Sequence, residues 1–455
     1  YYTLYEQLFT DYLRNIMDIL SVVRGIFGVL IIIGIAFLFS NNKRKVNWRL
    51  VGMGLLIQIV FAIFIIRSQY LSNIFSPLGW PKLVIEWLGG AIVALLGFTT
   101  EGAKFVFGNL AINNGSSSLG FFFAFQVLPT IIFVSSLTSV LYYLGILQRV
   151  VQGMAWVMIR LMGTSGAEPL SNTAKIFVGQ TEAPLLIRPY VGTMTQSELY
   201  TIMVGGMATI AGGVMAAYIQ MLGQSYAEAT HVDLATGQLN FAIQLLAAST
   251  MAAPAGLAIS KIIFPEVEES MTKGTVKIKV EKNSKNVIEA AAGGASDGLQ
   301  LSLNVGGMLI AFIALIALFN YVLTSFGNIG GINEYFQSTY HQPLSLQLLL
   351  GLVLQFVGFA IGVPWADSLH FGSLIGTKVV LNEFVAYLDL SNLIRQGAMS
   401  PKAIYMATFA LCGFANFSSM AIQIGGISPM APHRRQDIAS LGLRAVLGGT
   451  LATLM

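Results

Sequence analysis

Residues 176–187 read IFVGQTEAPLLI, an apolar stretch that polar residues interrupt in the middle. The apolar ends of this stretch are too short to cross a bilayer, yet Gln180, Thr181 and Glu182 between them carry an amide, a hydroxyl and a carboxylate. Non-helical backbone is tolerated at membrane depth only where it lines a watery cavity or is buried in protein. Ionisable groups at that depth are usually functional. The stretch therefore predicts a hairpin that enters the membrane and turns back, with a solute site at its tip.

The composition of the whole chain identifies lipid as its solvent. Of 455 residues, 55% are hydrophobic and 10% are charged, whereas a soluble domain has about 25% charged residues. We predict an all-α polytopic membrane protein with about eight transmembrane helices, interfacial helices and two re-entrant hairpins. The expected apolar spans are residues 21–40, 51–66, 120–144, 200–222, 239–264, 299–319, 344–363, 403–427 and 438 onward.

Charge and cysteine content set the topology and exclude several classes of function. Lys43, Arg44 and Lys45 follow the first span, so the positive-inside rule places that loop in the cytoplasm. The net charge of +4 is too small to indicate a nucleic-acid partner. Cys412 is the only cysteine, which excludes a disulfide framework and a thiol metal site. The four histidines are scattered without metal-ligand spacing.

The order of features predicts an internal repeat. Glu101-Gly102, the turn at Glu182 and a small-residue break recur in the second half as Asp297-Gly298, Asn382-Glu383 and a second break, at similar spacing. Such repeats mark the midplane site of secondary transporters. Chance spacing is the alternative, and the expected inversion does not follow from the pattern alone. We predict N-terminal scaffold helices over 1–80, a first repeat over 81–264 with a hairpin around 165–193, a polar cytoplasmic linker over 265–286, and a second repeat over 287–455 with a hairpin around 364–390.

Each half carries a place where a helix is expected to unwind. Residues 209–213 read TIAGG, and each glycine weakens a helix by about 1 kcal/mol. Freed carbonyls there suit a cation or a substrate, whereas close helix packing through small residues is the alternative. Asn416, Ser418 and Ser419 place three polar groups beside Gly413, which favours binding over simple packing. Phe414, within this cluster, suits a wall against a planar ring.

The two carboxylates, Glu182 and Glu383, are the strongest candidates for binding. An unpaired charge in such apolar surroundings costs at least about 2.5–3.5 kcal/mol. The pair suits sugar hydroxyls, base N–H groups or a cation, whereas a structural pairing with Arg or Lys is the alternative. Lys378 is one such partner for Glu383. Asp367 follows a helix-ending sequence and is expected to cap a neighbouring helix. A glycosidase-like acid pair is a poor fit, since the chain has neither a soluble cleft nor a sugar-stacking platform.

Three segments resemble the signature sequences of the concentrative nucleoside transporter family, whose bacterial members are nucleoside:cation symporters. They are IFVGQTEAPLLIRPY at 176–190, GTKVVLNEFVAY at 376–387 and CGFANFSSMA at 412–421. The resemblance runs from about residue 24 to the end of the chain. It implies a homotrimer in which each subunit has a scaffold and a mobile transport domain with two re-entrant hairpins.

The resemblance also implies an activity. The chain would be a secondary active transporter that imports nucleosides across the plasma membrane, the inner membrane of a bacterium, by an elevator-type alternating-access mechanism. It would not be an enzyme, and it would need no cofactor beyond Na⁺ or H⁺ as the coupling ion. Its partners would be the nucleoside and the lipid bilayer.

The same resemblance implies a role for each candidate site residue. The nucleobase would contact Gln180, Thr181 and Glu182. The ribose hydroxyls would bind Glu383, Asn416 and Ser419. The apolar walls would be Val214, Leu301 and Phe414. Sodium would be bound by Val178, Thr209 and Ile210.

Lys175 departs from the family pattern, because sodium-coupled members have Asn at the matching position. A protonated lysine has no lone pair for sodium, and its ammonium could occupy the place of the ion. This predicts either proton coupling or cation-independent exchange, whereas the alternative is that Lys175 points away and another group serves sodium. A channel and a membrane-embedded enzyme are the two alternative classes of function. A channel would need a continuous polar stripe, and an enzyme would need a nucleophile–base or metal set.

Overall fold

The computed structural model describes residues 19–66, 68–112, 119–272, 284–340 and 342–455. Throughout these ranges the regular elements are helices and no strand occurs. Seven of the described helices are long and apolar enough to cross a membrane, or up to eight if α16 (Leu346–Ile361) and α17 (Trp365–Val380), which meet at 119°, form one span. The predicted all-α polytopic membrane protein is confirmed.

The N-terminal region contains one long helix that the apolar-span prediction missed. It begins with α2 (Ile19–Leu38), α3 (Trp48–Ile66) and α4 (Ser68–Ile74), and then forms the 28-residue α5 (Trp80–Phe107). Charged residues along α5, among them Glu86 and Glu101, hide its apolar character in the sequence. Glu101 is exposed on α5, and Asp297 also lies within a long helix, so both acidic residues of the expected repeat are helical.

The first half of the remaining chain folds into helices that surround a broken span. Its elements are α6 (Phe123–Gln126), α7 (Leu128–Tyr143), α8 (Ile146–Met162), α9 (Ala167–Ala174), a 3-10 turn (Ala183–Ile187), α10 (Arg188–Val191), α11 (Gln196–Ala208), α12 (Gly212–Thr230) and α13 (Leu234–Ile263). The expected break in 200–222 is confirmed, because α11 ends at Ala208 and α12 begins at Gly212.

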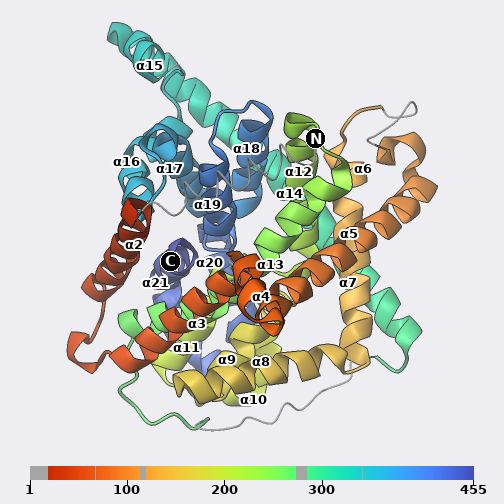
Figure 1. The fold of residues 1–455 in the computed structure, drawn as a ribbon, viewed down its shortest axis with the longest axis vertical. Coiled ribbons are helices and arrows are strands. Elements are labelled where there is room, and N and C mark those ends of the chain that lie inside the picture. The colour runs from red at the N-terminus through yellow and green to blue at the C-terminus, as the bar shows by residue number, and fades with distance from the viewer. Residues whose placement is uncertain (1–18, 67, 113–118, 273–283, 341) are drawn as a thin grey trace.

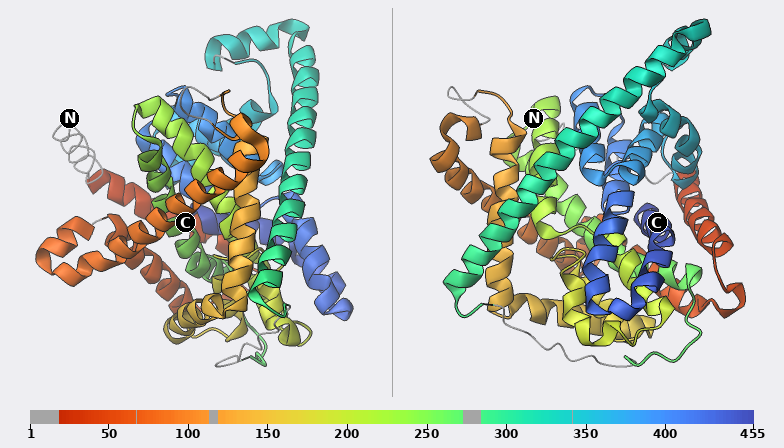
Figure 2. Two further views of the ribbon diagram at one scale, coloured as in Figure 1. Left: turned by 90° about the vertical axis from the view of Figure 1, so that its right-hand side faces the viewer. Right: turned by 180° about the vertical axis from the view of Figure 1, so that it is seen from behind.

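The second half begins with the 41-residue α14 (Val287–Gly327), which lies beside α7 along one side of the molecule (Figure 2). The helices that follow are α15 (Ile332–Tyr340), α16, α17, α18 (Glu383–Arg395), α19 (Pro401–Leu411), α20 (Phe417–Ile427) and α21 (Arg435–Leu454). The expected break near Asn416 is confirmed, since it separates α19 from α20.

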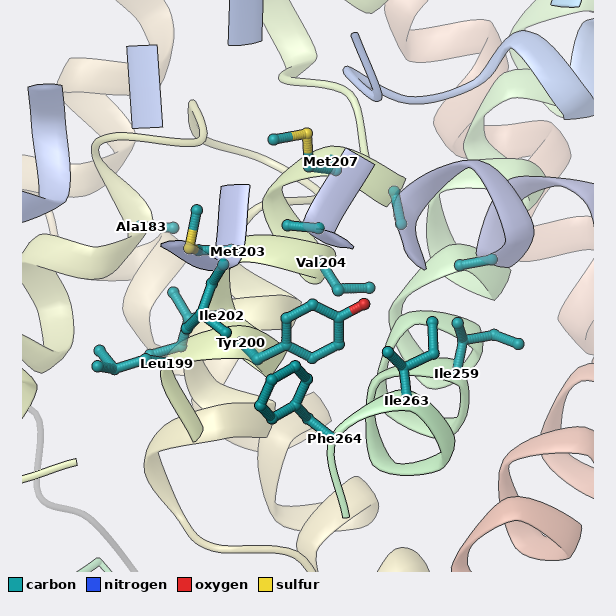
Figure 3. Packing of buried hydrophobic residues seen from close by; sticks show 14 of the residues in the cluster. Ala183, Leu199, Tyr200, Ile202, Met203, Val204, Met207, Ile259, Ile263 and Phe264 are labelled. Carbon is teal, nitrogen blue, oxygen red and sulfur yellow. The ribbon is translucent and has the colours of Figure 1, made fainter. Parts of the chain in front are cut away.

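The core lies around α11, α12 and α13, and α13 passes through the middle of the molecule (Figure 1). Over the most apolar part of α11–α12, 83% is buried, against 22% for α14. Tyr200 on α11 packs against Phe264 with ring centres 4.9 Å apart, and Met203 and Ile263 lie in the same cluster (Figure 3). A helix that is apolar on all sides belongs in such an interior, so the broken span is fixed by protein rather than by lipid.

Both predicted hairpins are helical arms on either side of a turn. In the first, α9 is followed by an irregular stretch, the 3-10 turn and α10; in the second, α17 and α18 flank Leu381-Asn382. Their depth in the bilayer and the inversion of the repeat stay predictions. Of the expected polar linker, residues 273–283 lie outside the described residues.

Candidate functional site

One cavity of about 190 Å³ lies where the two turns meet the two helix breaks. Its walls come from the first turn, the start of α12, the middle of α14, the start of α18 and the α19–α20 break. All nine side chains proposed from the sequence as substrate ligands line it. They are Gln180, Thr181, Glu182, Val214, Leu301, Glu383, Phe414, Asn416 and Ser419.

The first turn is held in shape by its own carboxylate and by α20. The amide of Gly179 donates to Glu182 Oε2 at 3.0 Å, which closes the turn and leaves the exposed carboxylate at the cavity. A Cβ added at Gly426 on α20 would lie 2.4 Å from Thr181 Cγ2. Glycine at position 426 is therefore what allows α20 to support the turn directly behind Thr181.

The second carboxylate is buried and held by two donors. Glu383 opens α18, whose N-cap Asn382 accepts a hydrogen bond from the amide of Val385 at 2.9 Å. Tyr218 Oη donates to Glu383 Oε1 at 3.0 Å, and Asn416 Nδ2 donates to Oε2 at 2.8 Å. Each carboxylate oxygen can accept further hydrogen bonds. The glutamate is thus oriented before any solute arrives.

The helix break before α20 fixes the amide of Asn416. This residue is the N-cap of α20, and its Oδ1 accepts from the amide of Ser419 and the hydroxyl of Ser418, both at 2.7 Å. With the oxygen engaged by these donors, the NH₂ group must face Glu383. Asn416, Ser418 and Ser419 therefore form a helix cap, and the NH₂ group of Asn416 in this cap donates to the buried carboxylate of Glu383.

Sequence reasoning missed two buried residues behind the cavity, Tyr218 and Gln423. Tyr218 lies four residues after Val214 on α12, and Gln423 lies four residues after Ser419 on α20. Residues four apart share a helix face, so this spacing was the available signal. Gln423 Nε2 donates to Gln180 Oε1 at 3.0 Å.

Lys378, the alternative partner for Glu383 in the sequence, is hydrogen-bonded elsewhere. Lys378 Nζ donates to the carbonyl of Ala410 at 2.8 Å and to Thr453 Oγ1 at 2.9 Å, and no ion pair joins it to Glu383 in the described chain. The end of α17 separates the two residues, and Lys378 faces the end of α19 and α21 instead. Lys378 thus ties α17 to α19 and α21 through these two hydrogen bonds.

The expected capping role of Asp367 is confirmed. Its carboxylate accepts from the hydroxyl of Ser400 at 2.5 Å and from the amide of Ser400 at 3.2 Å. Ser400 is the N-cap residue of α19. Asp367 therefore stabilises the start of a neighbouring helix and lies outside the cavity.

The residues proposed for sodium lie close to one another at the first helix break. Thr209 Oγ1 donates to the carbonyl of Gly205 at 2.8 Å, and the amide of Gly212 donates to the carbonyl of Phe177 at 3.3 Å. The second bond joins the start of α12 to the residue before Val178. Carbonyl and hydroxyl oxygens suit a hard cation. Across the described residues, no group of three His, Cys, Asp or Glu side chains could hold a metal ion.

Lys175 is buried beside this break. Its side chain is 1% exposed, and its Nζ donates to the carbonyl of Ile202 on α11. The hydroxyl of Thr209 binds the carbonyl of Gly205, three residues further along the same helix. At 1.5 Å of rise per residue, these two carbonyls are separated by about 4.5 Å along the helix axis. The carbonyl that holds the ammonium therefore lies about one turn before the carbonyl that holds the hydroxyl of Thr209.

A second polar cluster, also missed in the sequence, lies at the base of the first hairpin. Lys261 on α13 lies 2.5 Å from Glu168 and 3.2 Å from Glu266, and it donates to Ser197 Oγ at 2.8 Å. Lys261 and Glu168 are both almost fully buried. This cluster ties α9, which is the first arm of the hairpin, to α13 and to the start of the polar linker.

Replacing Tyr218 with Phe should weaken the binding of a solute in this cavity about tenfold, because the loss of one donor to a buried carboxylate costs roughly 1–3 kcal/mol. The Michaelis constant for uptake measures this loss. Tyr387→Phe is the matched control: Tyr387 is buried with its ring centre 4.4 Å from that of Tyr218, but its hydroxyl donates to the carbonyl of Thr408. An equal rise in both variants would show that Tyr218 acts only through packing.

Comparison with known proteins assigns the chain to a family. The models described as "Na+ dependent nucleoside transporter N-terminus", "Nucleoside recognition" and "Na+ dependent nucleoside transporter C-terminus" match residues 27–110, 124–225 and 244–455. An uncharacterized transporter of Haemophilus influenzae is 44% identical, with 96% of each chain covered. Sodium/nucleoside cotransporter 1 of Mus musculus is 40% identical over 94% of this chain and 62% of its own length.

Solved structures agree with the sequence comparisons. A protein called CNTnw, in an inward-facing substrate-bound state, is 39% identical, with a TM-score of 0.80 and 95% of each chain covered. A variant of the same protein in an outward-facing state has a TM-score of 0.82 at 37% identity, with 96% of each chain covered. The fold and cavity thus define a multi-pass membrane transporter rather than an enzyme. The chain belongs to the concentrative nucleoside transporter family.

Proposed function

We propose that this chain is a secondary active transporter that imports nucleosides, coupled to a cation gradient, by an elevator-type movement of the domain that carries both hairpins. The observation that carries the proposal is the single cavity in which Glu182 and Glu383, from separate halves of the chain, face the same space. Family membership supports nucleosides as the solute. The shape and polarity of the cavity support a small guest with several hydroxyl and N–H groups.

The proposed binding mode assigns one end of the solute to each turn. Gln180, Thr181 and Glu182 would contact the nucleobase. The ribose hydroxyls would donate to Glu383 and would bind Asn416 and Ser419, the group already ordered around that carboxylate. The apolar walls would be Val214, Leu301 and Phe414.

Coupling between binding and movement follows from the cost of carrying charge. An unpaired carboxylate in hydrocarbon costs at least about 2.5–3.5 kcal/mol. A nucleoside lowers that cost by donating hydrogen bonds to Glu182 and Glu383. The domain with a bound nucleoside therefore moves across the membrane more easily than the empty domain. The tight hydrogen bonds from Tyr218 and Asn416 keep Glu383 in position for this exchange.

The long helix α14 supports a scaffold role and a trimer. Large apolar side chains along it face outward, including Ile310 at 76% exposure and Leu303 at 62%. Such a surface needs lipid or a partner subunit to cover it. We propose that the chain forms a homotrimer in the plasma membrane, the inner membrane of a bacterium, with the repeats over 81–264 and 287–455 joined by a cytoplasmic linker over 265–286.

Uptake of radiolabelled uridine into proteoliposomes tests this proposal. A carrier gives saturable accumulation that depends on an imposed cation gradient. Linear, unsaturable flux would instead indicate a channel, and chemically altered uridine inside the vesicles would indicate an enzyme. Either of these outcomes would contradict the proposed transport cycle.

The burial of Lys175 favours a second candidate for the coupling step. Its ammonium binds the carbonyl of Ile202, about one turn before the carbonyl of Gly205 that accepts from Thr209, and Thr209 with Val178 and Ile210 would otherwise bind sodium. The ammonium of Lys175 would then supply, at this place, the positive charge that a bound sodium ion would otherwise supply. Transport would then be coupled to protons, or would be cation-independent facilitation or exchange.

Replacing Lys175 with Asn should make uptake sodium-dependent. We expect wild-type uptake to be nearly equal in sodium and choline buffers at fixed pH. In the variant, sodium should stimulate uptake about fivefold or more, the lower end of usual coupling between two ligands. Uptake in both buffers, repeated with an imposed pH gradient, measures the effect. Strict sodium dependence of the wild-type protein would exclude the tethered-cation mechanism.

A further inference from the structure

Behind the first turn, a buried glutamine holds one of the proposed nucleobase ligands. Gln423 on α20 is fully buried, and its Nε2 donates to Gln180 Oε1 at 3.0 Å and to the backbone carbonyl of Met203 at 3.2 Å. Gln423 does not line the cavity, whereas Gln180 does. Gln180 is the cavity residue to which Gln423 is hydrogen-bonded, so the direct route from Gln423 to a solute runs through Gln180.

The orientation of the Gln423 side-chain amide is fixed by the backbone carbonyl of Met203. A backbone carbonyl only accepts hydrogen bonds, so the atom of Gln423 that faces the Met203 carbonyl must be the NH₂ group. Reversing the amide would place two oxygen atoms 3.2 Å apart inside the protein. The backbone of α11 thus determines that Gln423 is a donor towards Gln180.

Close packing leaves Gln423 little freedom to rearrange. A Cβ added at Gly206 on α11 would lie 2.4 Å from Gln423 Nε2 and 3.3 Å from Gln180 Cβ. The missing side chain at position 206 is what lets α20 and the first turn approach α11 together. Gln423 is therefore confined between a helix backbone and the turn.

The consequence is a defined orientation for Gln180. Its Oε1 accepts from Gln423, and this is the one hydrogen bond of the Gln180 side chain among the residues that the structure describes. Since Gln180 lines the cavity, the free NH₂ group is the end available to a solute. The first turn therefore offers a hydrogen-bond donor at this position and requires an acceptor from the guest.

We infer that Gln423 is a positioning residue that makes the transporter select nucleobases with a hydrogen-bond acceptor on the edge far from the ribose. The inference rests on the proposed function, with the ribose at Glu383 and the base at the first turn. In a pyrimidine nucleoside the ring atom opposite the glycosidic nitrogen is C4. Uridine carries a carbonyl acceptor there, whereas cytidine carries an amino donor.

The test compares uridine with cytidine in wild-type protein and in Gln423→Met, which keeps the side-chain length and removes its hydrogen bonds. The wild-type ratio of kcat/KM for uridine over cytidine should be about ten, the value of one well-placed hydrogen bond. In the variant Gln180 is free to turn over, and the ratio should fall to about two or less, with KM changing more than kcat.

Gln58→Met is the matched control. Gln58 is also buried, its Nε2 donates to the backbone carbonyl of Met251 at 3.2 Å, and its Oε1 has no partner within the described chain. It lies away from the nucleoside cavity, against α13, and its loss should leave the uridine-to-cytidine ratio unchanged. A purely structural effect of Gln423 would lower kcat/KM for both nucleosides by the same factor, and this result would overturn the inference.

A measurement on unmodified protein keeps the inference testable if Gln423→Met does not fold. The uridine analogue that lacks the 4-oxo group should compete for wild-type uptake about tenfold more weakly than uridine. Equal competition by the analogue, or a wild-type preference for cytidine, would overturn the proposed role of Gln423. Failure of wild-type protein to transport any nucleoside would instead overturn the proposed function itself.

Discussion

Replacing Glu383 with Gln should abolish ribonucleoside transport while leaving the protein folded. The carboxylate is the proposed acceptor for two ribose hydroxyls, and hydrogen bonds to a charged group contribute about 1.5–3 kcal/mol each. The amide of a glutamine would also present a donor to either Asn416 Nδ2 or Tyr218 Oη, which both donate in the native site. Uridine uptake at subsaturating concentration should therefore fall by about 100-fold or more.

A comparison of substrates assigns this loss to the ribose. Wild-type protein should transport 2′,3′-dideoxyuridine as poorly as Glu383→Gln transports uridine. Glu383→Gln itself should transport dideoxyuridine almost as well as it transports uridine, because the ribose hydroxyls no longer contribute to binding. Such non-additivity is expected only for groups that interact directly. Glu101→Gln, at an exposed position on α5, is the control and should transport normally. Normal uridine uptake by Glu383→Gln would show that the ribose assignment is wrong.

Replacing Lys261 with Met should destabilise the protein severely. Lys261 is the cation between Glu168 at 2.5 Å and Glu266 at 3.2 Å, and its removal leaves the buried Glu168 without a counter-ion, held by the hydroxyl of Ser165 at 3.0 Å. Breaking a buried pair in this way costs about 3–5 kcal/mol. The thermal midpoint in detergent and the yield of monodisperse protein measure the loss.

Two further variants test whether the loss of stability comes from the buried Lys261–Glu168 pair or from removing a lysine charge in general. Replacing Glu168 with Gln in the Lys261→Met background removes the orphaned charge and should restore part of the thermal stability. Lys82→Met removes a partly exposed partner of Glu86, 3.3 Å away, and should change stability by less than about 1 kcal/mol. An unchanged midpoint in Lys261→Met would mean that this cluster does not hold the first hairpin arm in place.

Local signals in the sequence predicted the helix breaks and the membership of the cavity. Paired glycines after Thr209 and the polar run at Asn416 mark places where a helix is weakened, and the first break ends at these glycines while the second falls at the polar run. Nine side chains named from the sequence line one cavity. The family resemblance contributed most of their individual roles, whereas Glu182, Glu383, Phe414 and Asn416 also stood out as polar or aromatic groups in apolar surroundings.

Long-range pairing could not be predicted, because it depends on packing between helices far apart in the sequence. Lys378 lies five residues before Glu383, yet the end of α17 directs it to Thr453 on α21. Lys261 meets Glu168 across 93 positions, and no local pattern indicates that contact. The partners of Tyr218 and Gln423 could not be predicted for the same reason, since both residues lie within regular helices and contact residues far away in the sequence.

A structure of the protein with uridine bound is the most direct test of the central claim, that two acids from separate halves of the chain hold one small guest. We predict uridine in the cavity with its ribose hydroxyls within hydrogen-bond distance of Glu383 and its base against Gln180 and Glu182. A larger cavity of about 250 Å³ lies between α3, α13 and α19 and shares none of these residues. Uridine bound there, or held by only one of the two carboxylates, would contradict the claim.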